Sequence, residues 1–175
     1  MATDAGSLGY VPNYFRVLAH RPAVFAAWKQ LLGAVKGPMD ERRYELATLA
    51  AARRLRSSYC SLAHGKVLAE KFYSPDDVVG IASGTYPLDD LDAAVMEFAG
   101  KVAQDASSVT QADVDRLREL GLSDEEVVDV ALTAALRSFF TKTLDSLGAQ
   151  PDAAFRELDP GLRETLTVGR AIADD

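Results

Sequence analysis

Residues 40–72 read DERRYELATLAAARRLRSSYCSLAHGKVLAEKF. Apolar residues recur three and four positions apart in this stretch, which is the spacing of one face of an α-helix. Asp40 is placed to cap a first helix, and Ser57 or Ser58 to cap a second. In the first half, the apolar positions and the arginines fall largely on different sides: Leu46, Leu49 and Ala50 against Arg42, Arg43, Arg53 and Arg54. The stretch therefore predicts a pair of helices, 41–55 and about 57–72, within the segment 40–72.

Helix signals continue on both sides of this pair, and no sustained alternation of polar and apolar residues indicates strands. Pro22 can open a helix that ends between 33 and 38, and Ser74 precedes another short helix. The segment 88–104 has an apolar face, and Ser123 to Glu126 forms a capping box before the longest helix, 124–147. Residues 160–175 indicate only a weakly specified helix or tail. We predict one all-α domain over residues 1–175, a compact multi-helix bundle.

The composition limits the classes of partner. The chain has 175 residues, 48% hydrophobic and 26% charged, with a formal net charge of −7. An acidic chain does not attract phosphate backbones, so we expect no nucleic-acid partner. No apolar run reaches the roughly 20 residues of a membrane span, and residues 1–10 lack the features of a signal peptide, so we expect a cytoplasmic protein without membrane contact. The single cysteine cannot form an intramolecular disulfide.

Common motifs for cofactors and metals are absent from the sequence. There is no glycine-rich phosphate loop, no Gly-x-Ser-x-Gly elbow, no His-Glu-x-x-His and no calcium loop. Two histidines and one cysteine are too few for a structural zinc site. We therefore expect no bound cofactor or metal.

The start of the second helix holds the residues best suited to chemistry. Ser57, Cys60 and His64 are three and four positions apart, so on a helix their side chains form one stripe. A helix N-terminus, a nearby imidazole and nearby arginines each lower the pKa of a cysteine, which favours the reactive thiolate. The alternative is an inert buried cysteine beside a core histidine, because free cysteine is among the most buried residue types.

Glu45, Ser57, Cys60 and His64 together resemble the Glu…Cys-x-x-Cys-x-x-x-His motif of alkylhydroperoxidase D-like (AhpD-like) proteins in the carboxymuconolactone decarboxylase family. Further segments resemble an uncharacterised peroxidase-related subgroup: 10–15, 20–22, 109–114, 120–126 and the ending at 147–148. The resemblance covers most of the chain. It implies an AhpD-like helical fold, with residues 1–20 as an N-terminal extension.

The resemblance also implies roles for individual residues. Cys60 matches the cysteine that attacks peroxide, and His64 and Glu45 match the proton relay. Ser57 stands where the family has its resolving cysteine, and a hydroxyl cannot form the resolving disulfide. Glu45 has an alternative role as a solvated carboxylate paired with Arg42. Ser57 and Tyr59 are candidates for the substrate pocket, although a tyrosine in this position is often a packing or interface residue.

Three functions follow from these observations. The first is a thiol peroxidase-like oxidoreductase that reduces hydrogen peroxide or an organic hydroperoxide through Cys60, with an external thiol as reductant. The second is a decarboxylase-like lyase, which needs a cation for the substrate carboxylate, from Arg53, Arg56 or Arg137. The third is a degenerate, non-catalytic helical oligomer. The resemblance implies a homo-oligomer in each case, a dimer, trimer or hexamer.

Overall fold

The computed structural model describes residues 9–174, and this part of the chain is built of helices without strands. The all-α prediction is confirmed. The expectation of no signal peptide falls mainly on residues 1–8, which lie outside the described residues. In chain order the helices are α2 (Asn13–Leu18), α3 (Pro22–Lys36), α4 (Glu41–Arg54), α5 (Ser58–Lys71), α6 (Pro75–Ser83), α7 (Asp90–Asp105), η1 (Ala106–Ser108), α8 (Gln111–Glu119), α9 (Asp124–Ser146), η2 (Ala153–Glu157) and α10 (Pro160–Leu166).

The predicted caps determine where several helices begin. The Asp40 carboxylate accepts a hydrogen bond from the Arg43 amide at 2.9 Å, which starts α4. Ser123 and Glu126 exchange two hydrogen bonds, of 2.8 and 3.2 Å, in the predicted capping box of α9. Ser57 occupies the N-cap of α5 but makes no capping hydrogen bond to it.

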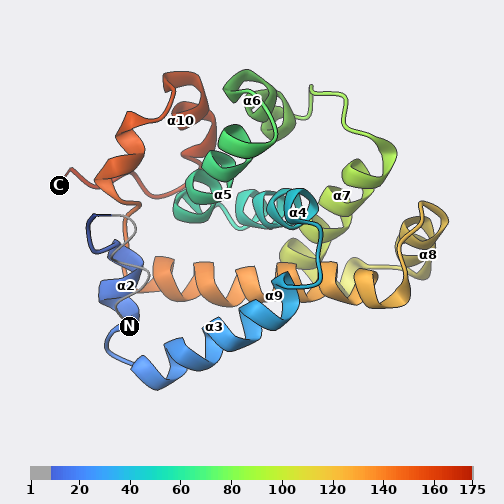
Figure 1. Ribbon diagram of the computed structural model, residues 1–175, viewed down its shortest axis with the longest axis horizontal. Helices are drawn as coiled ribbons and strands as arrows, with labels where there is room; N and C mark the ends of the chain where they lie inside the picture. Colours follow the sequence, from blue (N-terminus) through green and yellow to red (C-terminus); the bar gives the residue numbers. More distant parts are fainter. Residues whose placement is uncertain (1–8, 175) are drawn as a thin grey trace.

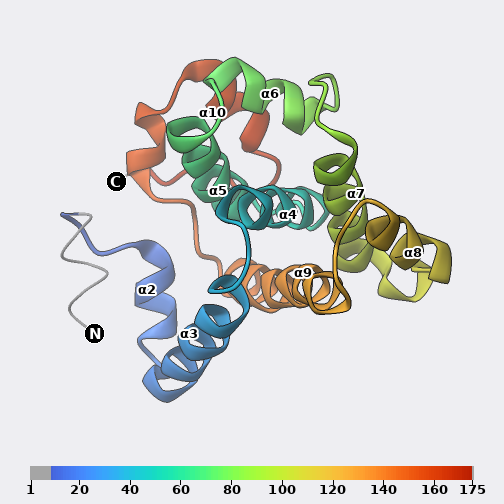
Figure 2. The same ribbon diagram turned by 45° about the vertical axis from the view of Figure 1, so that its right-hand side comes forward.

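Helix α4 lies at the centre of the bundle, with α5 and α7 on either side and α9 across it (Figures 1 and 2). Nine consecutive residues of α4, Tyr44 to Ala52, are buried. The sequence predicted an amphipathic helix with one solvated side, and this was wrong for the middle of the helix. Four alanines at positions 47 and 50–52 give α4 a narrow surface, so that neighbouring helices can approach it from several directions.

The C-terminal segment is more ordered than the sequence indicated. Helix α10 packs against α5 and α6, and its Leu162 and Leu166 are buried. Contact with α5 is close at Gly65, where an added Cβ atom would lie 2.3 Å from the Cδ1 atom of Leu166. Glycine at this position therefore allows α10 to cover the helix that carries Cys60 and His64.

We expect Leu166→Ala to reduce the free energy of unfolding by about 2–5 kcal/mol, because it removes a fully buried side chain and leaves a cavity. Urea denaturation followed by circular dichroism measures the change. Leu147→Ala is the matched control, because Leu147 is 64% exposed and its loss should change stability by no more than about 0.5 kcal/mol. Equal effects of the two substitutions would show that α10 does not belong to the folded core.

Candidate functional site

Cys60 lies in the first turn of α5 and its side chain is buried, with 1% of the residue exposed. The nearest charged group is the guanidinium of Arg137, which reaches the sulfur from α9. Its Nη1 atom donates a hydrogen bond to the Cys60 Sγ atom at 3.5 Å. The thiol is therefore in contact with a cation that lies 77 positions away in the sequence.

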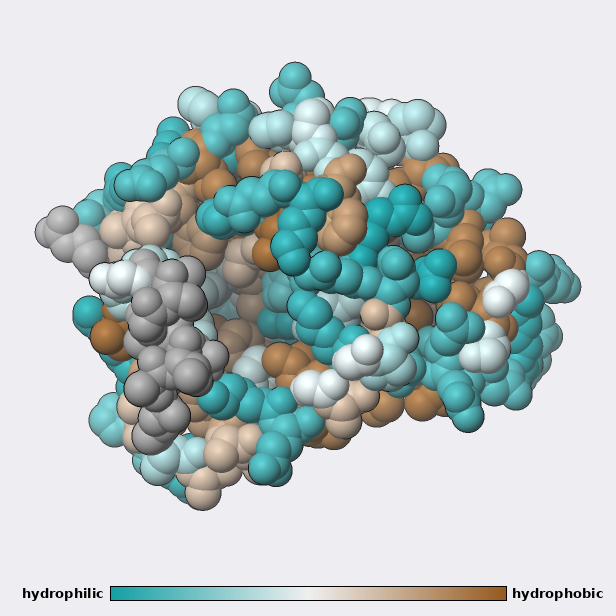
Figure 3. Space-filling model, in the orientation of Figure 1, coloured by the Kyte–Doolittle hydropathy of each residue, from teal (hydrophilic) through white to brown (hydrophobic). Residues whose placement is uncertain are grey.

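A cavity of about 360 Å³ lies beside Cys60, between α5 and α4 on one side and α2, α3 and α9 on the other. The space-filling view shows a hollow between these two groups of helices (Figure 3). The polar side chains that line it are Lys29, Lys36, His64 and Arg137, together with the Cys60 thiol. Its aromatic lining consists of Tyr14, Phe25, Trp28, Tyr44, Tyr59 and Phe140.

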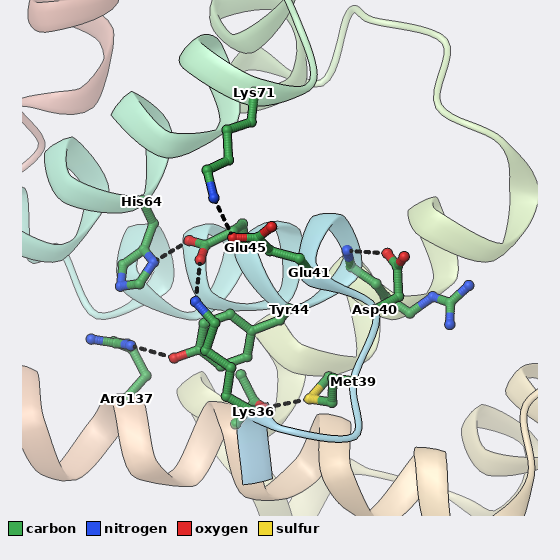
Figure 4. A network of polar contacts seen from close by, with 11 residues as sticks. Lys36, Met39, Asp40, Glu41, Tyr44, Glu45, His64, Lys71 and Arg137 are labelled. Atoms are coloured by element: carbon green, nitrogen blue, oxygen red, sulfur yellow. Dashed lines mark hydrogen bonds and ion pairs between the residues drawn. The ribbon is translucent and has the colours of Figure 1, made fainter. Parts of the chain in front are cut away.

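His64 and Glu45 are in direct contact. The Glu45 carboxylate faces the Nδ1 atom of His64 through its Oε2 atom and accepts a hydrogen bond from Lys36 Nζ through Oε1, at 3.1 Å (Figure 4). Burial alone would raise the pKa of Glu45, but the hydrogen bonds and charges of His64 and Lys36 hold that pKa below its usual value. Glu45 is therefore an anion inside the bundle.

The alternative partner of Glu45, Arg42, lies elsewhere. Its guanidinium is 2.6 Å from the carboxylate of Asp92 and 3.6 Å from that of Asp89. The reading of Glu45 as a solvated carboxylate paired with Arg42 was wrong, because Glu45 is on the buried side of α4, where His64 and Lys36 meet it.

The environment of His64 favours the neutral imidazole. Burial and the positive charge of Arg137 lower the pKa of His64, and the contact with Glu45 opposes them without reversing the direction. A neutral imidazole carries one N–H, and the carboxylate facing Nδ1 places the proton on that atom. The Nε2 atom is then left with a lone pair, so His64 can accept a proton there.

The pKa of Cys60 differs from the sequence-based prediction. Burial raises the pKa of the thiol, and the charge and hydrogen bond of Arg137 lower it by less. None of the three arginines before the helix, Arg53, Arg54 and Arg56, lines the cavity beside Cys60; Arg53 donates to the Thr165 carbonyl at 2.8 Å, and Arg54 packs against Gly100. The expected low pKa was wrong, because complete burial outweighs the helix terminus and the single nearby cation.

Tyr59 and Ser57 lie in different surroundings. Tyr59 lines the cavity, and its hydroxyl donates to the buried Asp152 carboxylate at 2.5 Å and accepts from the Tyr14 amide at 3.4 Å. Tyr59 thus connects α5 to α2. Ser57 is completely buried and is not among the residues that line the cavity.

Two charged residues of the site were missed or only partly anticipated. Lys36 was not singled out, and Arg137 was considered only as a carboxylate ligand. A sequence signal for Arg137 exists: it is the one charged residue in the segment 131–140, ALTAALRSFF. A charge in such an apolar part of a helix is typical of a buried, partnered group. Among residues 9–174 there is no cluster of three or more His, Cys, Asp or Glu side chains suited to a metal ion.

The chain is similar in structure to several solved proteins. The AhpD core of an uncharacterized peroxidase-related protein from Ralstonia eutropha JMP134 is 28% identical, with a TM-score of 0.78 over 86% of this chain and 82% of that chain. A peroxidase-related protein from Silicibacter sp. TM1040 is 19% identical, with a TM-score of 0.79 over 87% and 83%. A Cys-to-Ala variant of the debrominase Bmp8, in complex with 2,3,4-tribromopyrrole, is 17% identical, with a TM-score of 0.75 over 92% and 86%.

The last two similarities show the shared fold alone, since both identities are low. No protein-family model and no curated protein matches the chain. The structural neighbours confirm the AhpD-like resemblance that residues 45–64 indicated, and they include both peroxidase-related proteins and a debrominase. In the described residues, no helix is long and apolar enough to cross a membrane.

Proposed function

We propose that this AhpD-like chain is a thiol peroxidase-like oxidoreductase, in which Cys60 reduces hydrogen peroxide or an organic hydroperoxide and an external thiol restores it. The observation that carries the proposal is the pairing of the buried Glu45 carboxylate with His64, whose side chain lines the same cavity as Cys60. This pairing leaves His64 Nε2 as a proton acceptor one helical turn from the thiol.

The first step is transfer of the thiol proton. The Cys60 S–H bond breaks, its electron pair stays on sulfur, and His64 Nε2 takes the proton. The Glu45 carboxylate stabilises the imidazolium that forms, because the anion faces Nδ1–H. The resting site therefore holds a neutral thiol and a neutral imidazole, and the reactive ion pair forms when the proton moves.

The second step is attack on the peroxide. The thiolate forms a bond to the terminal oxygen of ROOH, the O–O bond breaks, and the departing RO⁻ takes the proton from His64 to leave as ROH. Cys60 is oxidised to sulfenic acid and the peroxide is reduced to an alcohol, or to water when R is hydrogen. His64 returns to its neutral form.

The third step needs a thiol from outside the chain, because Ser57 offers no second sulfur. An external thiol attacks the sulfenic sulfur and forms a mixed disulfide while water leaves. A second external thiol then releases Cys60 and leaves as a disulfide with the first. The chain would act as a one-cysteine peroxidase whose reductant is a small thiol or a reduced thiol protein.

Trapping of sulfenic acid tests this proposal. Wild-type protein is titrated with hydrogen peroxide or cumene hydroperoxide in the presence of a sulfenic-acid reagent, and Cys60 is followed by mass spectrometry. We expect labelling of Cys60 much faster than labelling of the same protein unfolded in urea, and none in Cys60→Ser. Labelling no faster in folded than in unfolded protein would refute the peroxidase and favour the non-catalytic helical oligomer.

The position of Arg137 favours a second candidate, the decarboxylase-like lyase. Arg137 and Lys36 line the cavity, so a substrate carboxylate would meet cations there. Arg53, by contrast, is engaged with the Thr165 carbonyl, and neither Arg53 nor Arg56 lines the cavity. A lyase would turn over a lactone acid without peroxide and would retain its activity in Cys60→Ser, whereas the peroxidase would lose it.

A further inference from the structure

Arg137 is a buried cation that lacks a carboxylate partner in residues 9–174. Only 4% of the residue is exposed, and none of the ion pairs found in this part of the chain includes it. Its guanidinium donates to Cys60 Sγ at 3.5 Å and to the Tyr44 hydroxyl at 3.3 Å, and lies 5.6 Å from the centre of the Phe140 ring. Its Nε atom has no hydrogen-bond partner.

The other buried charges of the site are compensated. The Glu45 carboxylate meets both His64 and Lys36, as Figure 4 shows beside the Arg137–Tyr44 contact. The Glu45 charge acts on Arg137 without contact, and a buried cation with no counter-charge in contact is strongly unfavourable, which arginine does not relieve by losing a proton. Of the two groups that accept hydrogen bonds from the guanidinium, Cys60 is the one that the proposed reaction converts to an anion.

We infer that Arg137 is a catalytic residue of this site: its guanidinium is the counter-charge of the Cys60 thiolate, and the Tyr44 hydroxyl positions it. This inference rests on the proposed function and adds to it a residue outside the Glu45, Cys60 and His64 set. In the first step the proton still goes to His64 Nε2, because arginine has no lone pair to accept it. Arg137 contributes by stabilising the negative charge that the departing proton leaves on sulfur.

The charged and titratable groups around Cys60 and its cavity come from five helices. They are His64 and Tyr59 from α5, Tyr44 and Glu45 from α4, Arg137 and Asp145 from α9, Lys29 and Lys36 from α3, and Tyr14 from α2. Burial and the Asp145 carboxylate raise the pKa of the thiol, and among the groups that lower it the charge of Arg137 has the largest effect. Loss of Arg137 therefore removes the main influence that favours the thiolate.

The pH dependence of Cys60 alkylation tests this role without peroxide. Iodoacetamide reacts with the thiolate, so its rate rises with pH through the pKa of the thiol. Arg137→Met keeps most of the side-chain volume and removes the charge. We expect the alkylation rate near neutral pH to fall about tenfold or more in this variant, with the pH profile displaced to higher pH, because a nearby opposite charge typically lowers an acid's pKa by about 1 unit or more.

Arg137→Lys and Tyr44→Phe provide the controls. The lysine variant retains the charge and should recover part of the rate, whereas Tyr44→Phe keeps the arginine and loses only the hydrogen bond that holds it, so a smaller fall in the same direction is expected. Circular dichroism verifies that each variant is folded. An unchanged pH profile in folded Arg137→Met overturns the inference. If Arg137→Met does not fold, an unchanged profile in Tyr44→Phe overturns it instead.

The design separates this inference from the proposed function. A wild-type protein that does not react with peroxide but shows the Arg137-dependent alkylation profile would refute the peroxidase and leave the role of Arg137 in place. A protein that reacts with peroxide but whose alkylation profile does not depend on Arg137 would refute the role of Arg137 and leave the peroxidase proposal in place.

Discussion

Replacement of His64 by alanine is expected to slow peroxide oxidation of Cys60 by about 10²–10⁴-fold, the usual contribution of a positioned general base. The reason is the buried state of the thiol. Because burial raises the pKa of Cys60, little thiolate is present at neutral pH, and the reaction depends on a group that takes the proton during the reaction. His64 is the neutral base in the same cavity.

The measurement is the second-order rate constant of Cys60 oxidation, followed by quenched-flow mass spectrometry over about pH 5 to 9. His20→Ala is the matched control, because His20 is the second histidine of the chain and is exposed outside this cavity. It should leave the rate constant unchanged. A His64→Ala rate equal to that of wild type would show that water, and not His64, removes the thiol proton.

Glu45→Gln separates the charge of Glu45 from its shape. The amide can still accept the hydrogen bond from His64 Nδ1–H, but it no longer stabilises the imidazolium or neutralises Lys36. We expect the rate constant of Cys60 oxidation to fall by less than in His64→Ala. His64 can still take the thiol proton, but the imidazolium that forms in this step is less stable without the carboxylate. A rate above that of wild type would contradict a relay that includes Glu45.

The sequence predicted the parts of the site that depend on local spacing. The helix that begins at Ser58, the stripe of Cys60 and His64, and the cap of α4 at Asp40 all follow from short-range rules, and each is confirmed in position. The place of Glu45 opposite His64 was available only through the family resemblance, because the two residues lie on different helices.

The electrostatics of the site were not predictable in the same way. Whether Cys60 is exposed or buried depends on helices from other parts of the sequence: α4, α6 and α10 pack against α5, and α9 brings Arg137 to the sulfur. The same packing brings Lys36 to Glu45 and Arg137 to the sulfur, while Arg53 and Arg54, close in sequence, point elsewhere. Proximity in sequence thus indicated Arg53 and Arg54 as the cations near Cys60, whereas the arginine that contacts the sulfur is Arg137 of α9.

Ser57→Cys is expected to convert the chain into a two-cysteine protein that forms an internal disulfide under peroxide. Ser57 and Cys60 are the N-cap and third residue of α5, so their side chains are three positions apart at the start of one helix. Residues at this spacing lie about 5–6 Å apart between Cβ atoms, and a small adjustment of the first turn brings them within disulfide reach. The substitution also loses no cap, because the Ser57 hydroxyl makes no capping hydrogen bond to α5.

The expected chemistry follows from the sulfenic acid of Cys60. In the wild type it persists until an external thiol arrives, whereas in Ser57→Cys the new thiol attacks it, the S–S bond forms and water leaves. Intramolecular attack has a large advantage over a bimolecular one, so trapping by a sulfenic-acid reagent should fall by about 10²-fold or more. Intact-mass spectrometry should show that each oxidised chain has lost two hydrogens.

Ser61→Cys is the matched control for this experiment. Ser61 is also completely buried in α5, but it directly follows Cys60 and points about 100° away around the helix, so its thiol cannot bond to Cys60 without distorting the backbone. Sulfenic acid should persist in Ser61→Cys as in the wild type. If it also persists in Ser57→Cys, the position of Ser57 does not correspond to that of a resolving cysteine, and the external thiol is required for a reason other than the missing sulfur.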